Sequence, residues 1–179
     1  MNAADEVARA IPREPAEKAA AMGEAEFERL YHATAGAILG YLTAVLGRRD
    51  VADDLLQETY CRLLAQGPAM TGLELEAARR YLFRIASNLL RDRWRTGEGQ
   101  PFPEPVEEGG GADFDTALEI QAMLRLLNPK ERTLLWLAYV EGMSHAEIAA
   151  ATGLGRLSVR TLLFRARNRA KRLLEGEAR

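Results

Sequence analysis

Apolar residues recur at helical spacing in two separate blocks of this chain, and a glycine- and proline-rich segment divides the blocks. Residues 27–46, 51–64 and 82–90 carry apolar side chains every three to four positions, as do residues 117–127, 134–140 and 159–170. No segment shows the alternation typical of a half-buried strand. We therefore expect an all-α protein made of two small helical domains that are joined by a flexible acidic linker.

Composition places the boundaries between these parts. Residues 1–23, with Pro12 and Pro15, are expected to form a mobile N-terminal tail. The first helical domain should cover residues 24–96, and the second should cover residues 114–179. The linker between them, residues 97–113, is rich in Gly and Pro and carries Glu and Asp without Lys or Arg.

Charge is distributed in blocks, which matters more than the net charge of −2 at pH 7. Residues 79–95 hold six arginines against the single acid Asp92. Residues 156–172 hold seven basic residues and no acid. Such basic blocks favour contact with nucleic acid phosphates, whereas the acidic linker and the acidic first sixty residues do not.

Other function classes find no support in the sequence. Cys61 is the single cysteine, which excludes an internal disulfide and a multi-cysteine zinc site. No nucleophile–base pairing, phosphate-binding loop or metal-ligand spacing occurs, so we expect no enzyme, no cofactor and no metal. We also find no apolar run long enough to span a membrane and no signal peptide, and we expect a cytoplasmic protein.

The second domain has the spacing of a helix-turn-helix. Asn128 and Glu131 form a capping box at one helix start, and Ser144 and Glu147 form a second box that begins a short helix. Ala149 is small where two helices would cross, Gly153 suits a turn with positive φ, and Val159 anchors the next helix. That helix should run from about Arg156 to Leu174 and leave six polar residues for DNA: Arg156, Ser158, Arg160, Thr161, Arg165 and Arg167. The alternative is a plain helical pair with a solvated basic face.

Several segments together resemble the extracytoplasmic-function sigma factors of the sigma-70 family. In the first half these are residues 52–60 and 81–95; in the second half they are residues 126–132, 144–149 and 164–167. The resemblance covers about residues 27–95 and 118–174, and its motifs follow the family's order across a linker. It implies a sigma factor that directs core RNA polymerase to specific promoters and helps to melt the −10 element.

The resemblance also implies partners and sites. Asp53, Asp54, Gln57 and Glu58 would bind the β′ clamp helices of core polymerase, which also contacts a sigma factor through its β flap. An acidic face opposite the leucines of the same helix suits a basic partner surface, although a merely solvated face is the alternative. Promoter DNA and an anti-sigma factor would be the further partners.

For the −10 element the resemblance points to six residues of the basic block: Arg80, Arg84, Ser87, Asn88, Arg91 and Arg95. Arginines there can neutralise phosphates, and Ser87 and Asn88 can offer hydrogen bonds to base edges. The loop from Gln66 to Leu75 resembles the family's pocket for a flipped base. We expect Trp94 to pack in the core rather than stack on a base.

The second domain departs from the family pattern at its DNA-reading helix. Leu157 and Ser158 stand where the family often has Gly-Thr, and Thr161 and Leu162 stand where it often has Ser-Arg. Leu157, Thr161 and Phe164 form an apolar stripe at helical spacing. We expect this stripe to widen the core; contact with thymine methyl groups or with an inhibitory partner are the alternatives.

Two other functions remain open from the sequence alone. The chain could be a stand-alone helix-turn-helix regulator, which would have no use for the acidic face. It could also be a sigma-like decoy that binds an anti-sigma factor. Such a decoy would keep its function after loss of Arg156 and Arg160.

Overall fold

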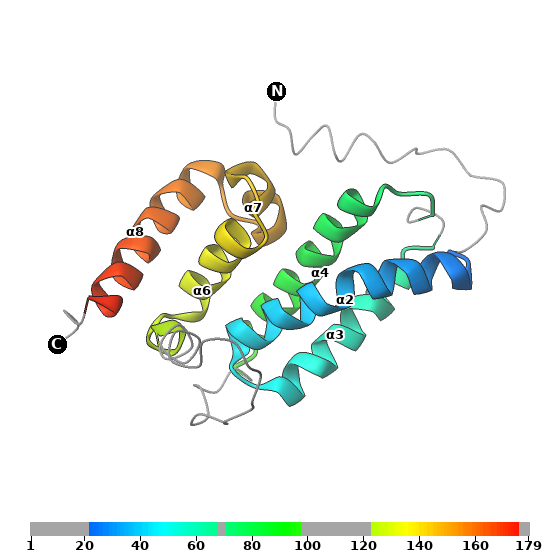
Figure 1. Ribbon diagram of the computed structural model, residues 1–179, viewed down its shortest axis with the longest axis horizontal. Coiled ribbons are helices and arrows are strands. Elements are labelled where there is room, and N and C mark those ends of the chain that lie inside the picture. The colour runs from blue at the N-terminus through cyan, green and yellow to red at the C-terminus, as the bar shows by residue number, and fades with distance from the viewer. Residues whose placement is uncertain (1–21, 68–70, 98–122, 176–179) are drawn as a thin grey trace.

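A computed structural model describes residues 22–67, 71–97 and 123–175 of the chain. Its main elements are helices, drawn in Figure 1: α2 (Glu24–Leu46), α3 (Arg49–Leu64), α4 (Leu75–Arg95), α6 (Pro129–Leu135), the π-helical turn η2 (Trp136–Val140), α7 (His145–Thr152) and α8 (Arg156–Leu174). The described residues contain no strand. The all-α prediction is confirmed, and α8 has the predicted bounds. The predicted tail and linker lie outside the described residues, apart from their ends.

The first three helices form a bundle around side chains that are fully removed from solvent. Ile38, Tyr41 and Leu42 of α2 pack in its centre with Leu63 of α3 and Leu82 of α4. Gly47, with φ of 68°, ends α2 in the left-handed conformation, and its N–H donates to the Thr43 carbonyl. Because a glycine adopts this conformation without strain, the chain turns there into α3. Trp94 packs against the core as predicted.

The last helices form a second unit whose starts are fixed by two capping boxes. Asn128 accepts a hydrogen bond from the backbone of Glu131, and the Glu131 side chain accepts one from the Asn128 backbone. Ser144 and Glu147 make the same reciprocal pair at α7. Each box satisfies two N–H groups that a helix start otherwise leaves unpaired, so both predicted helix starts are confirmed.

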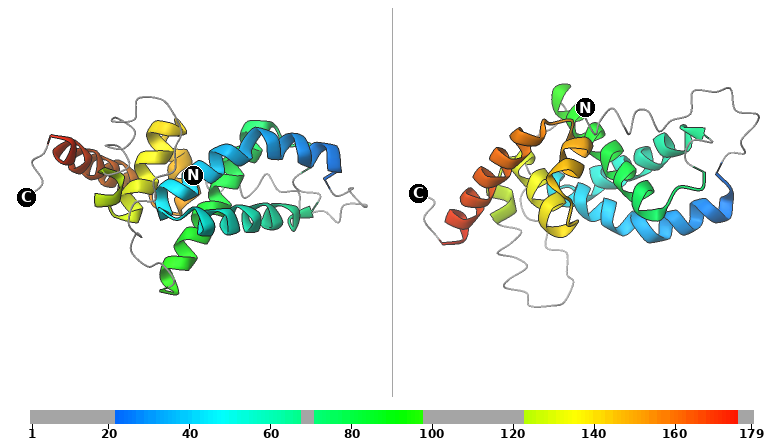
Figure 2. Two further views of the ribbon diagram at one scale, coloured as in Figure 1. Left: turned by 60° about the horizontal axis from the view of Figure 1, so that its bottom comes forward. Right: turned by 90° about the horizontal axis from the view of Figure 1, so that it is seen from above.

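The two units pack against each other rather than lying apart. α7 contacts α4, α6 contacts α2, and one apolar cluster runs through both units. Trp136 lies against Gly40 of α2, where a Cβ atom would stand 3.4 Å from the indole ring. α8 lies at the end of the molecule farthest from the α2–α3 bundle (Figure 2). Among the described helices, none combines the length and apolarity needed to cross a membrane.

Candidate nucleic-acid interface

The helix-turn-helix has the predicted geometry. Gly153 takes a φ of 71° and donates its N–H to the Ala149 carbonyl at 2.9 Å. Ala149 and Val159 are buried where α7 and α8 cross. The inward face of α8 is completed by Leu163, Ala166 and Ala170, all buried. A glycine at the turn and small residues at the crossing therefore fix how α8 is presented.

The outward face of α8 carries the predicted DNA-binding residues. All six are exposed: Arg156, Ser158, Arg160, Thr161, Arg165 and Arg167. The helix has no acidic residue in its first turn, and Gly155 at its N-cap gives no side-chain cap. The Arg167 guanidinium lies 5.7 Å from the centre of the Phe164 ring. The helix is thus free to place positive charge against a duplex.

The apolar stripe of α8 contradicts our expectation that it widens the core. Leu157 is 84% exposed and Phe164 is 55% exposed, and Thr161 is exposed between them. The core contacts of α8 are already made by Val159 and Leu163, which lie on the opposite side of the helix. The stripe therefore needs another explanation.

α4 has the predicted basic face, but several of its arginines already have protein partners. Arg80 forms an ion pair with Glu147 of α7 at 3.1 Å. Arg91 donates to the Thr152 carbonyl at 2.9 Å and to Asn88 at 2.6 Å. Arg84 and Arg95 are exposed, and Arg95 lies 3.7 Å from Asp92. The residues assigned to the −10 element thus share one face of α4, with one exception.

That exception is Ser87, whose predicted contact with a base edge is wrong in this structure. Ser87 is 6% exposed, and its hydroxyl lies 2.9 Å from the Tyr41 hydroxyl inside the first bundle. Burial raises the pKa of Tyr41 to about 12, so the phenol stays protonated at neutral pH. Ser87 therefore joins α4 to α2, and it faces the core rather than DNA.

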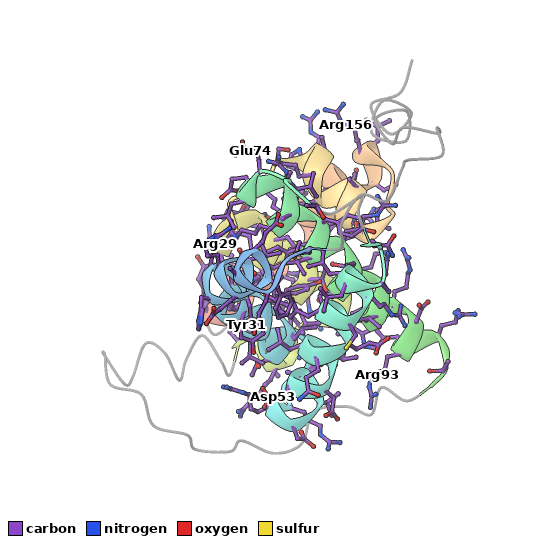
Figure 3. All side chains as sticks on the ribbon, turned by 90° about the vertical axis from the view of Figure 1, so that its right-hand side faces the viewer. Arg29, Tyr31, Asp53, Glu74, Arg93 and Arg156 are labelled. Atoms are coloured by element: carbon purple, nitrogen blue, oxygen red, sulfur yellow. The ribbon has the colours of Figure 1, made fainter. Side chains whose placement is uncertain are left out.

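The acidic face of α3 is exposed as predicted. Asp54 and Gln57 are exposed, while Asp53 pairs with Arg49 at 3.4 Å and Glu58 with Arg62 at 2.7 Å within the helix. Cys61 is exposed one turn beyond Gln57. Figure 3 places Asp53 and Arg156 at opposite edges of the molecule.

The predicted pocket for a flipped base lies partly outside the described residues, since these omit residues 68–70. Of its described part, residues 71–75 are exposed, and the Gly72 N–H donates to the Glu26 carboxylate at 2.8 Å. Within the described ranges, no group of three or more His, Cys, Asp or Glu side chains is placed to hold a metal ion.

Sequence reasoning missed the residues that join the two units. Glu141 accepts hydrogen bonds from Trp136 at 2.9 Å and from Arg79 of α4. The Glu141 side chain is 3% exposed. The π-helical turn positions it, because the Glu141 N–H bonds to the Trp136 carbonyl five residues back. No periodicity in the sequence signals such a turn.

Burial and hydrogen bonds shift two further pKa values in the second unit. Arg132 is 3% exposed, and desolvation lowers its pKa to about 10. The pKa of Glu147 is lowered, chiefly by the hydrogen bond from the Ser144 backbone and then by the Ser144 hydroxyl, with Arg80 adding to the effect. Glu147 is therefore ionised at neutral pH, both as a cap and as a partner of Arg80.

Known proteins are similar to this chain in sequence and in fold. The family model for Sigma-70 region 2 matches residues 30–99, and the model for Sigma-70, region 4 matches residues 117–169. The chain is 32% identical to the ECF RNA polymerase sigma factor BldN of Streptomyces coelicolor, over 88% of this chain and 64% of BldN. It thus spans just under two thirds of that relative.

One further relative and one solved structure are matched over most of their length. The RNA polymerase sigma-E factor of Streptomyces antibioticus is 31% identical, over 87% of this chain and 88% of that protein. The sigma factor RpoE of Bartonella quintana, solved in complex with the anti-sigma factor NepR, has the same fold, with a TM-score of 0.67 at 23% identity over 84% of this chain and 97% of that one. The chain belongs to the extracytoplasmic-function sigma factors of the sigma-70 family, which direct RNA polymerase to promoters.

Proposed function

We propose that this sigma factor binds core RNA polymerase through α3 and reads a promoter at two places, the −10 element through α4 and the −35 element through α8. The observation that carries the proposal is the separation of charge: α3 exposes carboxylates, α4 and α8 expose arginines, and the α3 and α8 faces lie at opposite edges of the chain (Figure 3). The acidic face of α3 can therefore attract a basic protein surface, while the basic faces of α4 and α8 attract phosphates.

Within this function each face has a defined set of residues. Asp53, Asp54, Gln57 and Glu58 contact the β′ clamp helices. Arg80, Arg84, Asn88, Arg91 and Arg95 contact the −10 region, which the chain helps to melt. Arg156, Ser158, Arg160, Thr161, Arg165 and Arg167 contact the −35 element, where arginine can bind guanine in a bidentate manner.

The remaining partners follow from the relatives. The Bartonella quintana RpoE structure holds an anti-sigma factor, and we extend such a partner, together with the β flap of the polymerase, to this chain. The protein needs no cofactor and carries out no chemistry of its own. It acts in the cytoplasm as a subunit of the polymerase.

A pull-down with core polymerase at low salt, followed by run-off transcription, tests this function directly. We expect the chain to bind core polymerase and to produce transcripts from discrete promoters. A stand-alone regulator would bind an operator without polymerase, and a decoy would bind an anti-sigma factor without supporting transcription. A chain that never binds core polymerase would exclude the proposal.

A paired substitution tests the docking face. Asp54→Ala with Gln57→Ala should weaken core binding and leave the thermal unfolding midpoint unchanged, because both side chains are exposed. The matched control is Glu24→Ala with Glu28→Ala, which removes exposed acids from α2. Equal core affinity of the test and control variants would contradict the assignment of α3.

A further inference from the structure

Leu157 contributes little to the stability of the fold, because 84% of the residue is exposed. It lies in the first turn of α8, the part of a helix-turn-helix that reaches base edges. Arg156, Arg160 and Arg165, all exposed, flank it on the same helix. A partner drawn to this side is therefore a polyanion, and the partner that the helix-turn-helix fits is duplex DNA.

Thr161 lies one turn after Leu157 and extends the same apolar surface. Its hydroxyl donates to the Leu157 carbonyl at 3.2 Å, so its methyl group is the part left for a partner. Leu157, Ser158, Thr161 and Leu162 line a shallow open hollow on the surface of α8. The 5-methyl group of thymine is the apolar group that a base pair presents in the major groove.

We propose that Leu157 and Thr161 read thymine methyl groups in the −35 element. This specificity rests on the proposed function of α8 and adds to it the class of base that the apolar stripe recognises. The arginines then position the helix on phosphates and guanines, while the stripe discriminates thymine from cytosine.

Replacement of thymine by deoxyuridine tests the contact, because it removes the methyl group and nothing else. The promoter is first mapped from run-off transcripts of the holoenzyme on genomic DNA, and each thymine of its −35 element is then replaced singly. With the wild-type holoenzyme, at least one replacement should weaken promoter binding about fourfold, the effect of one buried methyl group. With Leu157→Ala that same replacement should have no effect.

Leu174→Ala is the matched control, since Leu174 is 58% exposed at the far end of α8. The control should keep the wild-type response to deoxyuridine. If the wild type ignores every replacement, or if Leu157→Ala responds as the wild type does, the proposal is wrong. A chain that yields no promoter transcripts at all would instead refute the function on which the proposal rests.

Discussion

The two basic helices of this chain carry similar charge but are used in different ways. On α4, Arg79, Arg80 and Arg91 are bound by the other unit, and Ser87 is bonded into the core. On α8, the six residues assigned to DNA face solvent, and Arg156 and Arg160 have no ion pair among the described residues. The same density of arginine therefore has a structural role in one helix and an open binding role in the other.

The largest expected effect lies on α8. Arg156→Ala with Arg160→Ala should lower promoter-specific transcription by about two orders of magnitude, since each base-contacting arginine contributes about 1–3 kcal/mol to recognition. The unfolding midpoint should not move, because neither side chain contributes to packing. Run-off transcription and thermal melting measure the two quantities. A large loss of stability would show that α8 is not the open helix of the pair.

Most of this difference between α4 and α8 cannot be predicted from the sequence. The apolar spacing predicted each helix, and the local pairs Asn128–Glu131 and Ser144–Glu147 predicted two helix starts, because these signals act within a few residues of the chain. The exposed acidic face of α3 followed from the same spacing. Which arginines of α4 are bound depends instead on packing between residues about 60 positions apart, which leaves no local signal.

Two errors show the same limit. The hydroxyl of Ser87 predicts a hydrogen bond to DNA, yet Tyr41, 46 positions away, takes that bond in the core. The apolar stripe of Leu157, Thr161 and Phe164 predicts a core position, yet Val159 and Leu163 form the core side of α8 and the stripe lies on the opposite side. Residue type predicts which contacts a side chain can make, whereas packing against neighbouring residues determines whether it faces the core or solvent.

The second prediction concerns the contact between Tyr41 and Ser87, which joins α4 to the core of the first bundle. The pKa of Tyr41 is raised to about 12, so the unfolded chain ionises first, near pH 10, and the free energy of unfolding should fall as pH rises from 10 to 12. The fall amounts to about 2 kcal/mol. Tyr41→Phe should lack this loss, as denaturant titrations at pH 9 and pH 11.5 would show.

Because the pKa of Arg132 is about 10 and lies in the same range, the informative quantity is the difference between the wild type and Tyr41→Phe. Arg132 contributes equally to both proteins and cancels. Parallel pH profiles for the two proteins would mean that the Tyr41 phenol is not held inside the bundle, and α4 would then be as open as α8.

A third, smaller effect compares how α7 and α8 begin. Ser144→Ala removes the side-chain cap of α7 and should lower the free energy of unfolding by about 1 kcal/mol. Ser158→Ala is the matched control, since Ser158 is exposed in the first turn of α8, a helix with no side-chain cap. It should leave stability unchanged. Equal losses from the two variants in urea titrations would contradict the difference between the fixed and the open helix.

The smallest effect separates two arginines of α4 itself. Arg80→Ala removes a half-exposed ion pair with Glu147 and should cost less than about 1 kcal/mol of stability, because solvent and salt screen such pairs. Arg84→Ala, at an exposed position one turn later, should cost nothing. Both should reduce promoter transcription if this face meets DNA. Urea titrations at low and high salt measure the first difference, which should vanish at high salt. Loss of stability from Arg84→Ala, with none from Arg80→Ala, would mean that α7 is not held to α4 through Glu147, and the contrast between the two basic helices would then rest on Arg79 and Arg91 alone.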